Sequence, residues 1–334
     1  MAISSSFQTK SNARVIIGTE VTMGTPCNED DGVTIEMPVT DFSFDETHKH
    51  SLTVAPHRVG GAGFTQSDDM VRWDRTASMW DISITFHATA EAINRVCLTL
   101  FQDGTNPCAL LGSMPSLTTF THGGSNAVPV TMWFENSAHA GSSGVDMYFT
   151  SCLCTGLTFS GDITANGGVV LCTATFQTGY QPTEGAHTIE STSGANTLMG
   201  AQTTTFNMHD LTTETLNTED LLLYSFEFSI ARPVNRISFD PDNSYRPMGY
   251  SLGGFEVTGS LTCKRDVESA DAIDTATPVA LSLSTGVFQI EAPKVYVDAA
   301  GINFDDDGWK QTIPFRCTYD SAADTNPIVS IHTA

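Results

Sequence analysis

Two amphipathic strand patterns joined by a long polar segment, within residues 223–265, constrain the fold more than any other feature. In the first pattern, LYSFEFSI, apolar and polar residues alternate, and FEVTGSLTCK repeats the alternation after the polar segment. Because successive side chains of a strand point to opposite faces, each strand has one apolar and one polar face. The intervening residues 232–251 are rich in Pro, Asn and Asp, and loops of that length usually carry function. We therefore expect a sheet with one buried face and one face in contact with water.

The two halves of the chain show the same order of patterns. Each has an aromatic strand, a long polar loop (residues 45–75 and 232–251), an alternating strand, a helix and a closing hairpin. Phe42 corresponds to Phe226 at the first strand and Trp80 to Val257 at the second, and Cys172 to Ile313 at the last. All-β sequences can produce such patterns without duplication, but a helix at the same place in both halves favours a duplication.

The helices are expected over residues 89–102 and 267–276. In the first, apolar residues follow the spacing of one helix face, and Thr89 precedes them as an N-cap. Only 16% of the 334 residues are charged and 40% are hydrophobic, a composition that suits strands and a sizeable core. The fold class is therefore expected to be mainly β, with two similar β-sandwich or barrel units in tandem, each with one short α-helix and a long loop.

Four segments follow from these patterns. Residues 1–14 are Ser-rich and are expected to form a flexible N-terminal arm. A first β domain covers residues 15–180 and a second covers residues 219–334. Residues 181–218 contain much Thr, Ser and Gly and few large apolar residues, which indicates a linker or crossing segment.

The net charge of -23 argues against nucleic acid as a tightly bound partner. Acidic residues are spread over both halves, and tight binding to nucleic acid phosphates needs Lys and Arg instead. The eight cysteines fall mostly on apolar faces, which favours reduced core thiols in a cytosol. No apolar segment has the length of a membrane span, and the N-terminus does not resemble a signal peptide.

No residue pattern indicates an enzyme, a cofactor or a metal site. His48 and His50 flank a lysine without a third ligand nearby. The sequences DPDNS at residues 240–244 and DDDG at residues 305–308 contain oxygen donors but do not have the spacing of a calcium-binding loop, so turns are the better interpretation. The nine histidines are scattered, with no catalytic order.

Three segments resemble bacteriophage tail tube proteins, also called major tail proteins. The first is YSFEFSIARPV followed by GYSLGGFEVTGSLTCKRD, the second is the hairpin MYFTSCLCTGLTFSGDITANGGVVLCTATFQTG, and the third is FQIEAPKVYVDAAGINFDDDGWKQTIPFRCTYD. Together they lie within residues 39–320. Residues 181–218 and 232–251 depart from the family pattern, because their length and composition match no part of it.

The resemblance implies a structural virion protein, made in the host cytoplasm, whose stacked rings form the tail tube. Inner sheets of neighbouring subunits would join into a barrel around a lumen, through which genome DNA passes into the host without specific binding. The implied partners are other copies of the chain and other tail proteins at the tube ends, with no membrane insertion. Two units per chain favour trimers with pseudo-sixfold symmetry, and a hexamer with an outer second half is the alternative.

The resemblance also assigns site residues. The polar residues of the alternating strands would face the lumen, and the same residues could instead lie on a solvated outer sheet: Asp81, Ser83, Thr85, Ser225, Glu227, Ser229, Glu256, Thr258, Ser260 and Thr262. The long loops would contact neighbouring rings through His48, His50, Arg58, Asp68, Asp69, Arg236, Asp240, Asp242 and Arg246. An acidic, hydroxylated channel agrees with this function because it repels phosphates.

Two further functions compete with the tail tube. A tail adaptor, terminator or other virion β-sandwich protein would share the fold but would not assemble alone into long tubes. A carbohydrate-binding or hydrolytic β-sandwich would need exposed aromatics on a concave face or paired carboxylates, and most of the four Trp here fall on strand patterns.

Overall fold

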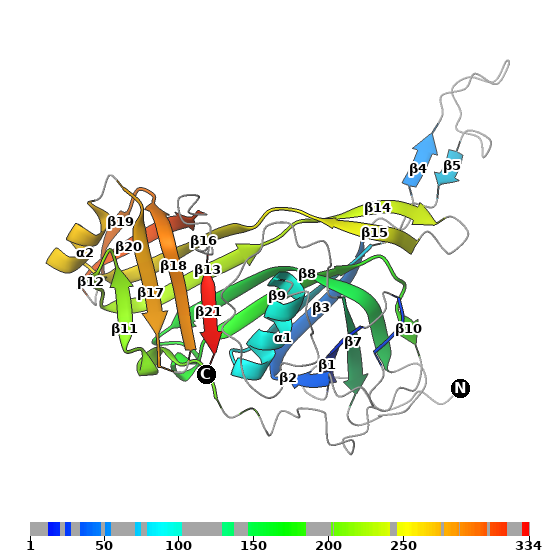
Figure 1. The fold of residues 1–334 in the computed structure, drawn as a ribbon, viewed down its shortest axis with the longest axis horizontal. Coiled ribbons are helices and arrows are strands. Elements are labelled where there is room, and N and C mark those ends of the chain that lie inside the picture. The colour runs from blue at the N-terminus through cyan, green and yellow to red at the C-terminus, as the bar shows by residue number, and fades with distance from the viewer. Residues whose placement is uncertain are drawn as a thin grey trace.

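One antiparallel sheet runs through both halves of the molecule (Figure 1). The computed structural model describes residues 13–20, 24–27, 34–47, 51–54, 71–74, 79–101, 129–136, 146–184, 202, 204–240, 246–274, 277–286, 288–305, 308–318 and 329–333. Strands dominate these residues, and two α-helices accompany them. The expected mainly β fold is therefore confirmed.

The sheet that crosses from one half to the other, here called the main sheet, has the strand order β3, β6, β9, β8, β13, β16, β20, β19. Four strands come from the first half: β3 (Val39–Thr47), β6 (Met79–His87), β8 (Met147–Asp162) and β9 (Leu171–Thr178). Four come from the second: β13 (Leu223–Ala231), β16 (Glu256–Lys264), β19 (Gly301–Asp305) and β20 (Gly308–Cys317). The halves meet where β8 pairs with β13.

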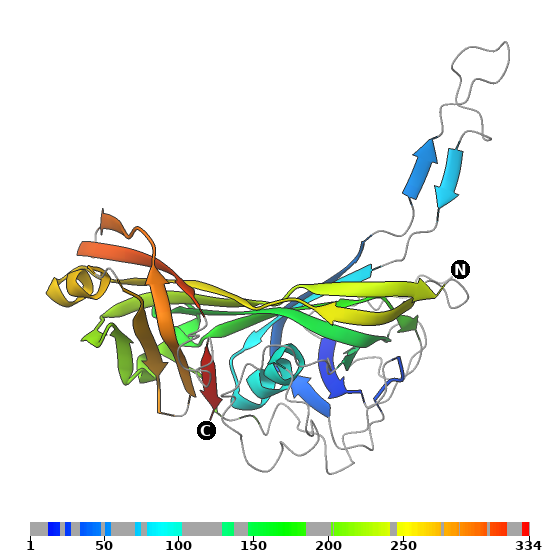
Figure 2. The same cartoon turned by 45° about the horizontal axis from the view of Figure 1, so that its top comes forward.

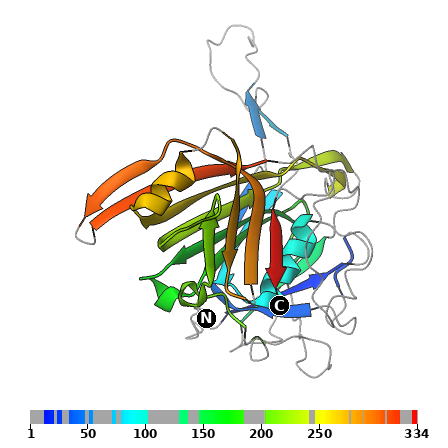
Figure 3. The ribbon, with the colours of Figure 1, turned by 60° about the vertical axis from the view of Figure 1, so that its left-hand side comes forward.

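A second layer of strands covers one face of the main sheet. In the first half it contains β1 (Ala13–Thr19), β2 (Thr34–Met37), β7 (Val130–Asn136) and β10 (Thr183–Glu184). In the second half it contains β11 (Thr213–Leu216), β12 (Glu219–Asp220), β17 (Val279–Ser284), β18 (Phe288–Val297) and β21 (Ser330–Thr333). Figure 3 shows this layer in the second half, with β21 in red.

The strand pairings follow one order in both halves. In the first half β1 pairs with β2 and β7, β7 with β8, β8 with β9, β9 with β6, and β6 with β3. In the second half β11 pairs with β12 and β17, β17 with β18, β18 and β19 with β20, β20 with β16, and β16 with β13. The continuous strand β8 thus has the place that β18 and β19 share.

Both helices begin at side-chain caps. Thr89 Oγ1 accepts a hydrogen bond from the Ala92 amide at 3.3 Å at the start of α1 (Ala90–Phe101), as the sequence predicted. Helix α2 (Val267–Ile273) begins with a capping box between Asp266 and Ser269, and is shorter than the expected 267–276. Along the chain, α1 follows β6 and α2 follows β16, which hold the same place in the pairing order of the two halves.

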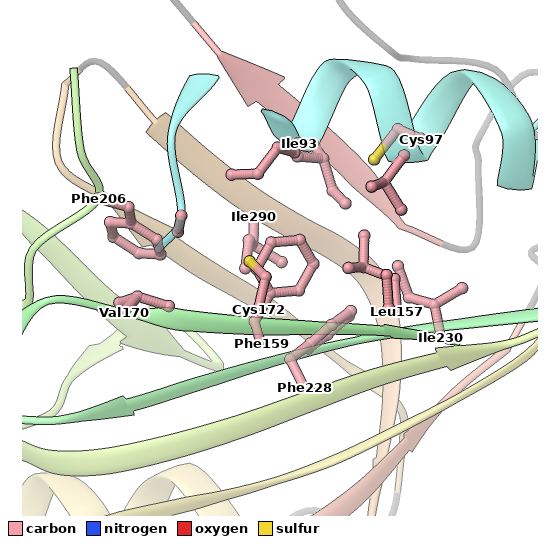
Figure 4. Packing of buried hydrophobic residues seen from close by; sticks show 14 of the residues in the cluster. Ile93, Cys97, Leu157, Phe159, Val170, Cys172, Phe206, Phe228, Ile230 and Ile290 are labelled. Carbon is pink, nitrogen blue, oxygen red and sulfur yellow. The ribbon is translucent and has the colours of Figure 1, made fainter. Parts of the chain in front are cut away.

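The buried core lies between the main sheet and its cover of α1 and the second layer. Figure 4 shows Ile93 and Cys97 of α1 above Leu157 and Phe159 of β8. One connected cluster of buried residues includes side chains of both halves, among them Phe176, Phe228 and Phe315. Because burying apolar surface is favourable by about 25 cal/mol per Å², this shared core favours folding of the two halves together.

Both long polar loops contain strands, which the sequence analysis missed. Residues 45–75 include β4 (Ser51–Val54) paired with β5 (Val71–Asp74), and residues 232–251 include β14 (Val234–Asp240) paired with β15 (Arg246–Leu252). The turn-forming Pro, Gly, Asn and Asp residues between these strands dominated the composition. Figures 1 and 2 show that β14 and β15 prolong β13 and β16, while β4 and β5 extend away from the rest of the molecule.

Three expected boundaries need correction. Strand β1 begins at Ala13, inside the expected arm of residues 1–14. Residues 205–218 are packed rather than loose, because Phe206, Met208 and Leu216 are buried and β11 pairs with β17 of the second half, ahead of the expected start at 219. The alternating residues 287–297 and 309–319 are expected to form the closing hairpin, but β19 rather than β18 pairs with β20 next to Gly308, where Asp305 lies opposite it. Each of these boundaries depends on pairing or packing between residues far apart in sequence, which local composition does not predict.

Candidate functional site

The uncovered face of the main sheet, here called the polar face, is the candidate functional site. Its register is visible in one row of hydroxyl residues that crosses five strands. Each residue of the row lies opposite the next one, in the order Thr85 (β6), Thr173 (β9), Thr158 (β8), Ser229 (β13) and Thr258 (β16). Because opposed residues in neighbouring strands point to the same side of a sheet, this row defines one face.

The ten residues expected on the lumen side all lie on the polar face. Their strand neighbours Ile84, Phe228 and Leu261 are fully or almost fully buried, whereas the polar residues are half-buried or exposed. The face therefore carries Asp81, Ser83 and Thr85 on β6, Ser225, Glu227 and Ser229 on β13, and Glu256, Thr258, Ser260 and Thr262 on β16. That this face lines a lumen stays a prediction.

Sequence reasoning missed the contributions of four further strands. The register adds Asp41, Ser43 and Asp45 on β3, Thr173, Thr175 and Gln177 on β9, Thr158, Ser160 and Asp162 on β8, and Thr312 and Arg316 on β20. The same alternation of polar and apolar residues is present in these strands. It could have identified them once their neighbours in the sheet were known.

Cross-strand hydrogen bonds join the side chains of the polar face. The Oγ1 atoms of Thr85 and Thr173 lie 3.1 Å apart, and Thr158 Oγ1 lies 3.0 Å from Ser229 Oγ across the junction of the two halves. Gln177 Nε2 donates to Asp81 Oδ1 at 2.8 Å. Such pairs contribute a few tenths of a kcal/mol to about 1 kcal/mol each and hold the side chains close to the sheet.

Acidic side chains outnumber basic ones on the polar face. The acidic residues are Asp41, Asp45, Asp81, Asp162, Glu227 and Glu256, and the basic ones are Lys264, Lys310 and Arg316. The hydroxyl and the amide of Thr164 donate hydrogen bonds to Asp162 and, with the nearby charge of Lys310, lower the pKa of this carboxyl. A net negative, hydroxyl-rich face offers phosphates little attraction.

Most residues expected at ring-stacking loops fall outside the described residues. These are His48, His50, Arg58, Asp68, Asp69 and Asp242. Arg236 and Asp240 lie on β14 and Arg246 lies on β15, where Asp240 is opposite Arg246. The structure therefore places these three on a strand pair that reaches beyond the main sheet (Figure 2).

The described part of the chain contains few candidates for metal ligands or reactive thiols. No group of three or more His, Cys, Asp or Glu within these ranges could hold a metal ion. The seven described cysteines are buried, and burial raises the pKa of Cys154 and of Cys317 to about 12, so both thiols are protonated at neutral pH. Within the same residues, neither helix has the length and apolarity needed to cross a bilayer.

The buried carboxylate of Glu20 has a structural role away from the polar face. It accepts hydrogen bonds from Thr131 Oγ1 at 2.7 Å, from the Ser151 amide at 2.6 Å and from the Gly24 amide at 3.2 Å. Ser151 has a positive φ of 52° at the point where β8 passes from the second layer into the main sheet. Glu20 thus supports a backbone conformation that L-residues seldom adopt.

This carboxylate predicts a pH-dependent stability. Burial is the largest cause of the raised pKa of Glu20, and the hydrogen bonds lower it only in part. The folded protein therefore binds this proton more tightly than the unfolded chain. The contribution of Glu20 is complete below its ordinary pKa of 4.5 and is lost as the pH rises through the folded-state pKa.

Urea unfolding of the wild type and of Glu20→Gln at several pH values above 4.5 checks this. We expect the difference in unfolding free energy, wild type minus variant, to fall as the pH rises. Two curves that stay parallel over this range would show that Glu20 titrates normally.

No protein-family model matches the sequence, and no curated protein matches it either.

Proposed function

We propose that this chain is a structural subunit of a phage tail tube, whose rings enclose a lumen lined by the polar face. The observation that carries the proposal is the main sheet itself, which is covered on one face and is acidic and hydroxylated on the other. Since such a face needs no covering partner, it suits the inner wall of a water-filled channel. The resemblance of the strand sequences to tail tube proteins supports the same function.

The proposal includes a tandem duplication of one β unit. The shared pairing order supports it, as do matching bulges between Val39 and Asp41 in β3 and between Leu223 and Ser225 in β13. The pairings adjust the equivalence at the last strand. Ala174 lies opposite Ile84 and Ile313 lies opposite Leu261, so Ile313 corresponds to Ala174 rather than to Cys172.

A ring built from such chains would use the same junction many times. Inside one chain, β13 of the second unit continues the sheet of the first unit through β8. If consecutive copies continue it in the same way, three chains place six units around one axis. DNA inside would meet carboxylates and hydroxyls but no array of cations, and would pass without being held.

Negative-stain electron microscopy of the purified protein, with rotational averaging of end views and mass measurement, tests this function. We expect stacked rings with an open lumen and three chains per ring. Six chains per ring would keep the conduit and contradict two units around one axis. Single rings that never stack would favour an adaptor or terminator, and a monomer at every concentration would overturn the proposal.

A further inference from the structure

The outermost strand β19 exposes large apolar side chains on the side of the sheet that is elsewhere buried. Ile302 is 55% exposed and Phe304 is 64% exposed, and Trp309 on the adjoining β20 is 58% exposed. The Phe304 and Trp309 rings pack against each other with centroids 4.9 Å apart. The register places Ile302 opposite Gln311 of β20, which is fully buried, so these apolar groups continue the buried face past the edge of its cover. Exposed apolar patches of this kind mark contact surfaces.

The other outer strand of the main sheet is β3, whose aromatic residues lie on the same buried side. Phe42 and Phe44 are half-buried and pack against the core. The Phe42 ring lies 5.3 Å from that of Phe134, and the Phe44 ring lies 5.6 Å from that of Phe149. Among the described strands, β3 pairs with β6 and β19 pairs with β20. The two ends of the sheet thus offer apolar groups of the same kind.

The junction inside the chain shows how such ends can join. There β8 and β13 are antiparallel, with Phe159 opposite Phe228 and Leu157 opposite Ile230 on the buried side. By the pairing order, β3 has the place of β13, and β18 with β19 has the place of β8. The equivalent of this junction would therefore use β3 of one copy and β19 of the next.

The register of that contact follows from the internal one. In β3, Asp41, Phe42 and Phe44 have the places that Ser225, Phe226 and Phe228 have in β13, with the same bulge before them. Thr158 of β8 lies opposite Thr173, and Gly301 of β19 lies opposite Thr312, which holds the place of Thr173. Ile302 then takes the place of Phe159, and Phe304 that of Gly161.

We propose that β3 of one copy pairs antiparallel with β19 of the next copy, with Phe44 opposite Ile302, Phe42 opposite Phe304 and Asp45 opposite Gly301. This inference rests on the self-association in the proposed function and names its contact surface. The apolar pairs cover the side chains that β19 exposes in the single chain. The apolar residues supply the favourable part of the contact.

Disulfide cross-linking with two matched double variants tests the register. In Asp45→Cys with Gly301→Cys the thiols lie opposite each other, while in Asp41→Cys with Gly301→Cys they lie four residues apart along the strand. Four residues span about 13 Å, and a disulfide needs Cα atoms within about 7 Å. A Cβ atom added at Gly301 meets nothing within 4 Å, and Asp41 and Asp45 are exposed, so both variants are compatible with the fold.

After mild oxidation, non-reducing electrophoresis should show linked dimers and trimers for Asp45→Cys with Gly301→Cys. The control and the wild type, whose described cysteines are buried, should show only the single chain. Links that form only in the control would overturn the register. Rings visible by microscopy without links in either variant would overturn this contact and leave the conduit intact. A protein that stays monomeric by mass would overturn the contact and the proposed function together.

Discussion

Replacing Phe228 by alanine is expected to destabilise both halves of the protein at once, by about 3–5 kcal/mol. The side chain is 1% exposed and belongs to the strand that joins the halves, opposite Phe159 on one side and Gly259 on the other. Its ring centroid lies 6.0 Å from that of Phe315. A Cβ atom at Gly259 would lie 2.4 Å from the Phe315 ring, so the neighbouring strands are already in close contact and cannot collapse into the cavity.

Urea unfolding followed by far-UV circular dichroism and by tryptophan fluorescence measures this loss. The control is Glu227→Gln, one residue away on the exposed side of the same strand, for which a change below about 0.5 kcal/mol is expected. Because one buried cluster spans both halves, the two probes should shift together. A separate transition that the substitution leaves unchanged would show that the halves fold independently.

Reversing the charge of the polar face should convert a surface that repels DNA into one that binds it. The triple variant Asp81→Lys, Glu227→Lys and Glu256→Lys places three new cations among the hydroxyl residues of β6, β13 and β16. Each cation that meets a phosphate releases counterions, so affinity should appear at low salt and fall steeply as salt is added. With about six phosphate contacts in an assembled ring, the loss between 50 and 200 mM salt is on the order of 10³-fold.

Gel-shift titration of duplex DNA with assembled protein at several salt concentrations measures this gain. The matched control is Glu184→Lys, Glu268→Lys and Asp271→Lys, which changes the net charge equally at exposed positions away from the polar face. We expect binding in the polar-face variant and little in the control or the wild type. Equal binding by both triple variants would indicate that net charge decides and that the polar face does not enclose DNA.

Local periodicity in the sequence was enough to assign faces and some elements. The alternation around Phe226 and around Ile82 placed ten polar residues on one side of their strands, where the register also places them. The apolar spacing and the hydroxyl of Thr89 located α1, whose cap the structure contains. These features depend on neighbours within a few residues, because strand alternation, helix repeat and capping are local properties of the chain.

Only the tertiary structure decided which strands are neighbours. Nothing in the alternation of β8 distinguishes β13 from any other partner. The turn sequence DDDG did not show whether β18 or β19 pairs with β20 beside it. Phe206 looked like part of a linker and is buried in the core. An amphipathic strand offers the same hydrogen-bonding edge and the same apolar face to every partner. The choice among partners, and with it the continuous polar face, depends on packing between residues that are far apart in sequence.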